Sequence, residues 1–380
     1  MAKRTIQIAV PVTGDDEWHA LREPLATGWI TQGPKVTAFE TRFADIHHVD
    51  HALAVTSCTT GLHLILAALG IGPGDEVIVP AFTWVSTANV VLYCGATPVF
   101  VDVDKETHNI SVAAVKEAVT ERTKAVMAVH LFGLCADIDG LRAVLPSEVK
   151  IIEDAACAAG AHYKGRMAGG LGDAAAFSFH PRKSITTGEG GMVTTNDPAL
   201  ADVMNKMRNH GAEISEEQRH HGPRPYILPD FNLLGFNYRM TDMQGAVGLV
   251  QIEKLKNLIT ERQKWARYYR AGLADLPWLS LPVDAGEDHH ALQAFVTRID
   301  ESQAPYSRND IMDKLMAQGI ATRPGTHAVH MLGYYAARFQ FAPNDFPNAK
   351  YADQQSMAIP LHNKMSQDDF DYIIDVLHAL

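Results

Sequence analysis

The chain has 380 residues, 47% of them hydrophobic and 20% charged, so it is long enough for two domains and too apolar for a disordered protein. Its 44 acidic and 33 basic residues give a formal net charge of −11, which argues against a nucleic-acid-binding protein. An anionic small molecule remains compatible with this charge, because a few local donors suffice to bind a phosphate group.

The cysteine pattern indicates a protein with reduced thiols. Cys58, Cys94, Cys135 and Cys157 form no C-x-x-C pair, so neither a disulfide framework nor a zinc ribbon is indicated. The first residues lack the apolar segment of a signal peptide, and no apolar stretch reaches membrane-spanning length. We therefore expect a cytoplasmic protein that does not associate with membranes.

From about residue 50, short β-rich runs alternate with amphipathic segments. Strands are predicted at 52–56, 76–79, 98–101, 125–129, 149–153, 174–179 and 192–195, and helices at 60–69, 86–93, 112–122 and 138–145. Repeated crossovers of this kind predict an α/β fold with a large, mostly parallel mixed sheet flanked by helices.

After a polar stretch, the second part of the chain changes to an α+β rhythm. The polar stretch spans 213–230, helices are predicted at 241–270, 308–318 and 367–380, and strands at 292–299 and 320–323. We predict a large domain with an N-terminal arm over 1–250 and a smaller α+β domain over 251–380, bridged by the long helix.

Known phosphate and metal motifs are missing from the sequence. Neither G-x-G-x-x-G nor G-x-x-x-x-G-K-[ST] occurs, and the adjacent histidine pairs lack the helical spacing of a metalloprotease, so we expect no metal. A different phosphate cradle is present, because strand 52–56 leads through SCTTG (57–61) into a helix whose free N–H groups and hydroxyls face one anion. Taken alone, such a segment is more often an N-cap.

Two further residues lie where a ligand of a parallel sheet binds, at strand ends. Asp154 follows strand 149–153, although a lone aspartate there more often caps a turn. Lys183 follows strand 174–179 and precedes a glycine-rich turn. A lysine forms a Schiff base with a carbonyl when partial burial and a neighbouring cation, here Arg182, favour its neutral form, whereas most single lysines are solvated. Phosphate cradle, aspartate and lysine together are the three anchors that pyridoxal phosphate (PLP) needs.

The sequence resembles the DegT/DnrJ/StrS-type sugar aminotransferases, PLP enzymes with the aspartate-aminotransferase fold (fold type I), over nearly its whole length. The matching stretches are TSCTTGLHL (56–64), GPGDEVIVP (72–80), GATPVFVD (95–102), VHLFG (129–133), EDAA (153–156), SFHPRKSITTGEGG (178–191) and GFNYRMT (235–241). The resemblance implies that Lys183 holds PLP as an internal aldimine, that Asp154 pairs with the pyridine nitrogen and that Trp84 stacks on the ring.

The resemblance also implies phosphate contacts and a shared site. Thr59, Thr60 and Ser178 match phosphate ligands, and Asn237 matches the asparagine that reaches the cofactor phosphate of the partner subunit, which implies a homodimer. Cys157 departs from the family, whose members have Gln, His or Glu near the phenolic oxygen of the cofactor. Either a water or a neighbour supplies that hydrogen bond, or Cys157 packs as a small hydrophobe.

The resemblance implies that the protein is a PLP-dependent aminotransferase of amino-sugar biosynthesis. It would move an amino group from glutamate to a nucleotide-linked keto-sugar. In the loop 322–330, Arg323 and His327 are candidates for holding the acceptor or the carboxylate of the donor. The alternative for this loop is that Arg323 pairs with a surface acid and His327 caps the loop.

Three other functions have weaker support in the sequence. Sugar dehydratases of the same fold replace the lysine by histidine, and Lys183 argues against that function. A non-catalytic regulator or sensor that keeps the fold is not excluded by the sequence. An oxidoreductase that uses a nicotinamide cofactor lacks support because the glycine fingerprint is missing.

Overall fold

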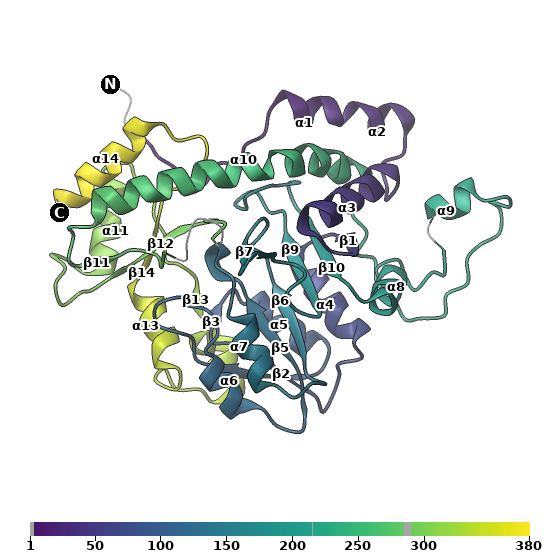
Figure 1. Ribbon diagram of the computed structural model, residues 1–380, viewed down its shortest axis with the longest axis horizontal. Helices are drawn as coiled ribbons and strands as arrows, with labels where there is room; N and C mark the ends of the chain where they lie inside the picture. Colours follow the sequence, from purple (N-terminus) through teal and green to yellow (C-terminus); the bar gives the residue numbers. More distant parts are fainter. Residues whose placement is uncertain (1–3, 215, 285–289) are drawn as a thin grey trace.

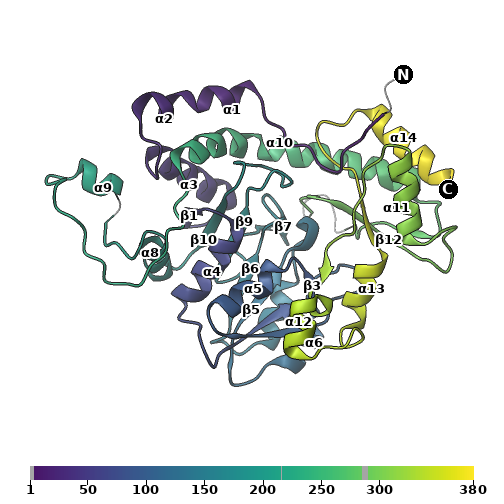
Figure 2. The ribbon, with the colours of Figure 1, turned by 180° about the vertical axis from the view of Figure 1, so that it is seen from behind.

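The computed structural model describes residues 4–214, 216–284 and 290–380 and has a central sheet with helices on both faces (Figures 1 and 2). The seven strands of this sheet follow the order β1-β10-β9-β6-β5-β2-β4. They are β1 (His51–Val55), β2 (Glu76–Pro80), β4 (Thr97–Val101), β5 (Thr123–Val129), β6 (Lys150–Asp154), β9 (Ala174–Ser178) and β10 (Gly191–Thr195). Strand β10 runs antiparallel to β1 and β9, and the other neighbours are parallel. The predicted α/β fold with a mostly parallel mixed sheet is confirmed.

Both faces of this sheet are buried under helices, because successive strand residues point to opposite sides. In β6, Ile152 belongs to the core beneath α4 (Cys58–Ala68), α5 (Ser86–Tyr93) and α8 (Pro198–Met207). Its neighbour Ile151 belongs to the core beneath α3 (Pro34–His47), α6 (Val112–Ala118), α7 (Ile138–Val144) and α10 (Asp242–Leu273). This double burial explains the nearly continuous apolar runs of the strands.

The long helix α10 crosses the molecule, and its two ends contact elements far apart in the sequence (Figure 1). It begins with a capping box, in which the Thr241 hydroxyl accepts a hydrogen bond from the Gln244 N–H. It packs on α3 near its start and on α14 (Gln367–His378) towards its end. The helix continues without a break through residue 250, and the division of the chain into domains at that residue stays a prediction.

The C-terminal part contains a second, antiparallel sheet of three strands around its own core. The elements of this C-terminal part include β11 (Leu279–Ser280), β12 (Phe295–Ile299), α11 (Arg308–Ala317), α12 (Gly333–Phe339), α13 (Pro347–Gln355) and β14 (Ser356–Ile359). The N-terminal segment joins this part through a parallel bridge between Ile6 and Ile320. No helix in the described ranges is long and apolar enough to cross a membrane.

Two predicted elements differ most from the structure. The helix expected over 112–122 ends at Ala118, because Thr120 and Thr123 form a turn in which the Thr120 N–H donates to the Thr123 hydroxyl at 2.9 Å. The strand expected over 320–323 is wrong, because Ile320 pairs with the N-terminal segment and Arg323 pairs with β14. Each end of that stretch therefore bonds to a different neighbour and no continuous strand forms.

Several short elements carry no periodic signal and were not predicted. They are α1 (Asp15–Ala20), α2 (Arg22–Thr27), α9 (Glu216–His221), the hairpin of β7 (His162–Tyr163) with β8 (Arg166–Met167), and the pair of β3 (Phe82–Thr83) with β13 (His327–Ala328). The segment around α9 projects from the body of the molecule in both views (Figures 1 and 2). Large apolar side chains of this projecting segment are exposed, among them Tyr226, Leu228 and Leu234.

Candidate active site

A pocket of about 470 Å³ lies at one edge of the large sheet. The carboxyl ends of β5, β6 and β9 meet there, since Val129 is opposite Asp154 and Asp154 is opposite Ala176 in the strand register. Ligands of open α/β sheets bind at this edge. Of the site residues expected from the sequence, those that line the pocket are Thr59, Trp84, Asp154, Cys157, Ser178, Lys183, Arg323 and His327.

The carboxylate of Asp154 is buried at the end of β6 and held by a small network. It accepts hydrogen bonds from the Thr87 hydroxyl at 2.8 Å and from the Ala156 N–H at 3.2 Å. The Thr87 hydroxyl also lies 3.0 Å from that of Thr83, and the thiol of Cys58 lies 3.8 Å from the carboxylate. Thr87 was not predicted as a site residue, because its only signal in the sequence is a second hydroxyl four residues after Thr83.

The neighbouring acid, Glu153, points to the opposite face of the sheet and has a structural role. It is fully buried, and its carboxylate accepts hydrogen bonds from the backbone N–H groups of Gly169, Leu171 and Gly172. His130 Nε2 lies 2.9 Å from the same carboxylate. Strand alternation thus leaves Asp154 alone to face the pocket from β6.

Lys183 lies in the loop between β9 and β10, and this loop is fixed to the rest of the fold. The Thr186 hydroxyl donates to the Phe179 carbonyl at 2.8 Å, and the Thr186 N–H donates to Gln251 of α10 at 3.1 Å. The amine nitrogen Nζ of Lys183 donates to the sulfur of Cys157 at 3.1 Å. The loop therefore holds the lysine beside the strand ends without help from a ligand.

The N-terminus of α4 forms the end of the pocket next to β10. Ser57 caps this helix by accepting from the Thr60 N–H at 3.1 Å, and the Thr60 hydroxyl accepts in turn from the Ser57 N–H at 3.0 Å. The Thr60 side chain is thus used in the capping box and does not line the pocket, whereas Thr59 does. A Cβ atom on Gly191 would lie 2.6 Å from the Ser57 carbonyl carbon and 2.7 Å from the Cys58 nitrogen. Only glycine at this position lets the helix N-terminus approach the sheet so closely.

The C-terminal part closes the pocket from the other side. Strand β13 pairs with β3, which brings the His327 ring to 5.7 Å, centroid to centroid, from the ring of Trp84. The Trp84 side chain is 57% exposed, so one face of the indole is free for a planar ligand. Arg323 is half-buried, and burial together with the charge of Arg182 lowers its pKa.

A model of the DegT/DnrJ/EryC1/StrS aminotransferase family matches residues 11–378. The chain belongs to this family. The PLP form of a proposed sugar aminotransferase from Streptococcus pneumoniae is 29% identical, with a TM-score of 0.90 and coverage of 99% of this chain and 98% of that one. The Helicobacter pylori aminotransferase PseC of pseudoaminic acid biosynthesis is 25% identical, with a TM-score of 0.91 and 99% coverage of both chains. The GDP-4-keto-6-deoxymannose-3-dehydratase ColD is 28% identical, with a TM-score of 0.88 and coverage of 98% and 100%.

This chain is thus an aminotransferase of fold type I that uses pyridoxal phosphate, and the pocket fits that cofactor. The N-terminus of α4 provides free N–H groups for an anion, and the close approach permitted by Gly191 shapes this cradle. Asp154 and Lys183 line the same pocket, so the carboxylate would hold the ring nitrogen and the amine would bond to the aldehyde carbon of one bound cofactor.

One predicted cofactor residue of the aminotransferase lies elsewhere. Asn237 is exposed, does not line this pocket, and forms an antiparallel bridge through its backbone with Asn209. Its predicted contact with the cofactor of a second subunit stays a prediction, since a single chain is described.

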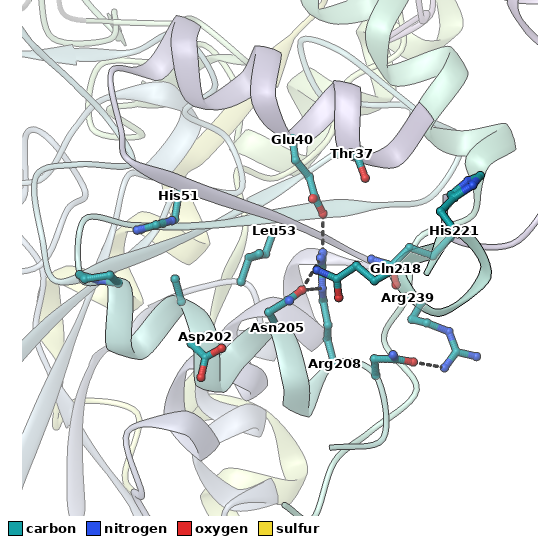
Figure 3. A pocket seen from close by; sticks show the side chains of 14 residues that line it. Thr37, Glu40, His51, Leu53, Asp202, Asn205, Arg208, Gln218, His221 and Arg239 are labelled. Carbon is teal, nitrogen blue, oxygen red and sulfur yellow. Dashed lines mark hydrogen bonds and ion pairs between the residues drawn. The ribbon is translucent and has the colours of Figure 1, made fainter. Parts of the chain in front are cut away.

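A larger pocket, of about 620 Å³, lies between α3, β1, α8 and α9, and its polar groups already bond to one another. Figure 3 shows Glu40 and Asn205 pointing at the guanidinium of Arg208. Arg208 also donates to the Ala54 carbonyl at 2.8 Å, and Glu40 accepts from the Ala54 N–H at 2.7 Å. This network joins α3, β1 and α8, so we assign it a structural role in the aminotransferase.

Proposed function

We propose that this aminotransferase moves the amino group of glutamate to a nucleotide-linked keto-sugar in amino-sugar biosynthesis. The observation that carries the proposal is the convergence of Lys183 and Asp154 in one pocket with the N-terminus of α4. Membership of the family and the likeness to sugar aminotransferases support a sugar as the acceptor.

Lys183 is the residue to which we assign proton transfer. PLP, when bound, supplies an aldehyde carbon for the amino group and a ring that accepts the electron pair of the α-carbon of the donor. The nitrogen Nζ of Lys183 takes the proton from that α-carbon in the first half-reaction. In the second half-reaction it returns a proton to the sugar carbon that receives the amino group.

We assign to the other residues of the pocket the binding and orientation of the cofactor. Asp154, fixed by Thr87, keeps a proton on the pyridine nitrogen, which strengthens the ring as an electron acceptor. Trp84 covers one face of the ring and keeps water from it. Thr59 and Ser178 bind the phosphate together with the N–H groups of α4.

We also propose a homodimer in the cytoplasm whose sites are shared. The apolar side chains exposed on the projecting segment, such as Tyr226 and Leu234, support an interface there. Asn237 follows this segment directly and is itself exposed. The four cysteines are all free, as suits a reducing compartment.

The proposed function is tested by monitoring the absorbance of the cofactor during each of the two half-reactions. Purified protein should be yellow and bleach with borohydride, and an untreated sample should convert to the pyridoxamine form on adding glutamate. Keto-sugars are then screened for the one that restores the yellow form. Lys183→Ala should fold but show no conversion. A protein that binds PLP without converting would indicate a sensor, and loss of water from the sugar without a new amine would indicate a dehydratase.

A further inference from the structure

Four basic side chains converge on one wall of the pocket, namely those of His180, Arg182, Lys183 and Arg323. Apart from burial, the charges of Arg182, Lys183 and Arg323 lower the pKa of His180, so these groups lie near one another. Within residues 4–214, 216–284 and 290–380, no ion pair joins Arg182 or Arg323 to an acid. Two permanent positive charges therefore face the pocket without a carboxylate of their own.

Arg323 presents a donor that lacks an acceptor. Its Nε atom is shielded from solvent and has no hydrogen-bond partner among the described residues. Its backbone is fixed to β14, since the Ala358 N–H donates to the Arg323 carbonyl at 2.8 Å. A shielded guanidinium N–H without an acceptor is destabilising, because water no longer satisfies it. An acceptor from a ligand would remove this cost.

Arg182 is placed by its backbone at the more open side of the wall. Its carbonyl accepts from the side-chain amide of Gln293 at 2.8 Å, and its N–H donates to His180 at 3.2 Å. Gln293 is itself fixed, because its carbonyl accepts from Arg262 of α10 at 3.1 Å. The backbone of Arg182 is thus fixed, whereas its side chain is exposed and can contact a ligand.

The acids of the same pocket do not neutralise this pair. Asp154 is occupied by Thr87 and the backbone, at the strand edge. Glu189 lines the pocket, and its charge acts on His180, whose pKa it raises against the other causes. The two arginines remain available for two negative charges from outside.

We propose that Arg182 and Arg323 bind the two carboxylates of a dicarboxylic amino donor and thereby select it over donors with one carboxylate. This inference rests on the proposed function and names the residues that choose its donor. Arg323 is the more buried of the two arginines and lines the pocket with Cys157 and Lys183, so we assign it the carboxylate next to the reacting carbon. Arg182 meets the distal carboxylate. Each guanidinium offers the planar fork that a carboxylate fits.

The diphosphate of a nucleotide-linked acceptor is the other source of anionic charge. We favour the dicarboxylate, because its two separate charges match two separate guanidinium groups, whereas a diphosphate carries its charges on adjacent groups. The test therefore compares both anions.

The experiment measures binding to the PLP-loaded protein by calorimetry and does not depend on turnover. The probes are glutarate, a five-carbon dicarboxylate without an amine, its monoamide, which lacks one carboxylate, and the nucleoside diphosphate UDP. The variants are Arg182→Gln, Arg182→Lys and Arg323→Gln. Arg122→Gln is the matched control, because Arg122 is an exposed arginine paired with Glu76 at the opposite edge of the sheet.

We expect wild type and Arg122→Gln to prefer glutarate over the monoamide by about tenfold or more, the loss typical of one charge-assisted contact. Arg182→Gln should abolish the preference for glutarate, and Arg182→Lys should keep part of it. Arg323→Gln should weaken the binding of both glutarate and the monoamide. Unchanged glutarate affinity in Arg182→Gln, or a loss confined to UDP, would overturn the proposal. These outcomes are independent of the proposed function, which fails separately if glutamate does not convert the wild-type cofactor.

Discussion

The amine nitrogen of Lys183 lies 3.1 Å from the sulfur of Cys157. The family resemblance led us to expect a larger polar residue at Cys157, and the sequence left open whether its thiol contacts a polar group or packs as a small hydrophobe. In the structure it lines the pocket, half-buried, and accepts a hydrogen bond from the lysine. Sulfur is a weak acceptor, so this contact positions Nζ while opposing its release less than an oxygen acceptor would.

We predict that Cys157 is the first cysteine alkylated by iodoacetamide in cofactor-free protein and that PLP protects it. Thiolate is the reactive form, and burial raises the pKa of Cys58, of Cys94 to about 11, and of Cys135 still further. Peptide mass mapping over time, with and without PLP, identifies the order. Earlier labelling of Cys94, or labelling unaffected by PLP, would contradict the prediction.

A second prediction concerns Asp154 and its hydrogen-bond donor. Asp154→Asn should lower kcat by about a hundredfold or more, because an amide does not keep the pyridine nitrogen protonated. Thr87→Val should lower kcat by about tenfold, since it removes the 2.8 Å hydrogen bond but leaves the charge. Half-reaction rates with glutamate and PLP retention by absorbance measure both. Asp154→Asn within about threefold of wild type would remove Asp154 from this role.

The sequence predicted more of the strands than of the contacts between distant segments. Lys183 and Asp154 follow strands whose apolar runs are plain, so their meeting at one sheet edge could be foreseen, whereas Trp84 follows the two-residue strand β3, which has no such run. The wall formed by Gln293 and Arg182 could not, because it depends on how the C-terminal part packs on the lysine loop. Sequence spacing carries no signal for such a contact.

Stability should fall in mild acid because of His47. Both ring nitrogens of this residue are buried without partners, and burial lowers its pKa to about 3. Above pH 6.5 both states are neutral. Between pH 6.5 and 3 the unfolded chain binds a proton at His47 that the native state does not bind. The free energy of unfolding therefore falls by about 1.4 kcal/mol for each pH unit of acidification. His108 and His290, with pKa lowered to about 4, act with the same sign.

His47→Phe should flatten this dependence, because the ring stacks on Phe43 at 4.1 Å and needs no charge there. Urea denaturation at pH 7.5 and pH 5, at one protein concentration, measures the difference. His19→Asn is the control, since His19 is an exposed histidine on α1. An equal slope in His47→Phe and wild type would show that other groups dominate.

Gly191→Ala should destabilise the fold by about 1–3 kcal/mol and also weaken PLP retention, because the added carbon meets only backbone atoms of the α4 N-terminus and β9. Gly333→Ala is the control, as a Cβ there contacts nothing within 4 Å. Urea midpoints and PLP titration measure the two effects. PLP affinity equal to that of wild type would show that α4 does not hold the phosphate.

The last prediction separates a shared site from a site built by one chain. Asn237→Ala and Lys183→Ala subunits are each inactive as homodimers if the exposed Asn237 serves the cofactor of the partner. In a hybrid dimer, the site that keeps Lys183 receives its Asn237 from the other chain, so one site is complete and the other carries both defects. Equal mixing with free exchange should restore about a quarter of the wild-type activity per subunit. If Asn237 instead served its own chain, no hybrid site would be complete, and proven exchange without recovery would establish that arrangement.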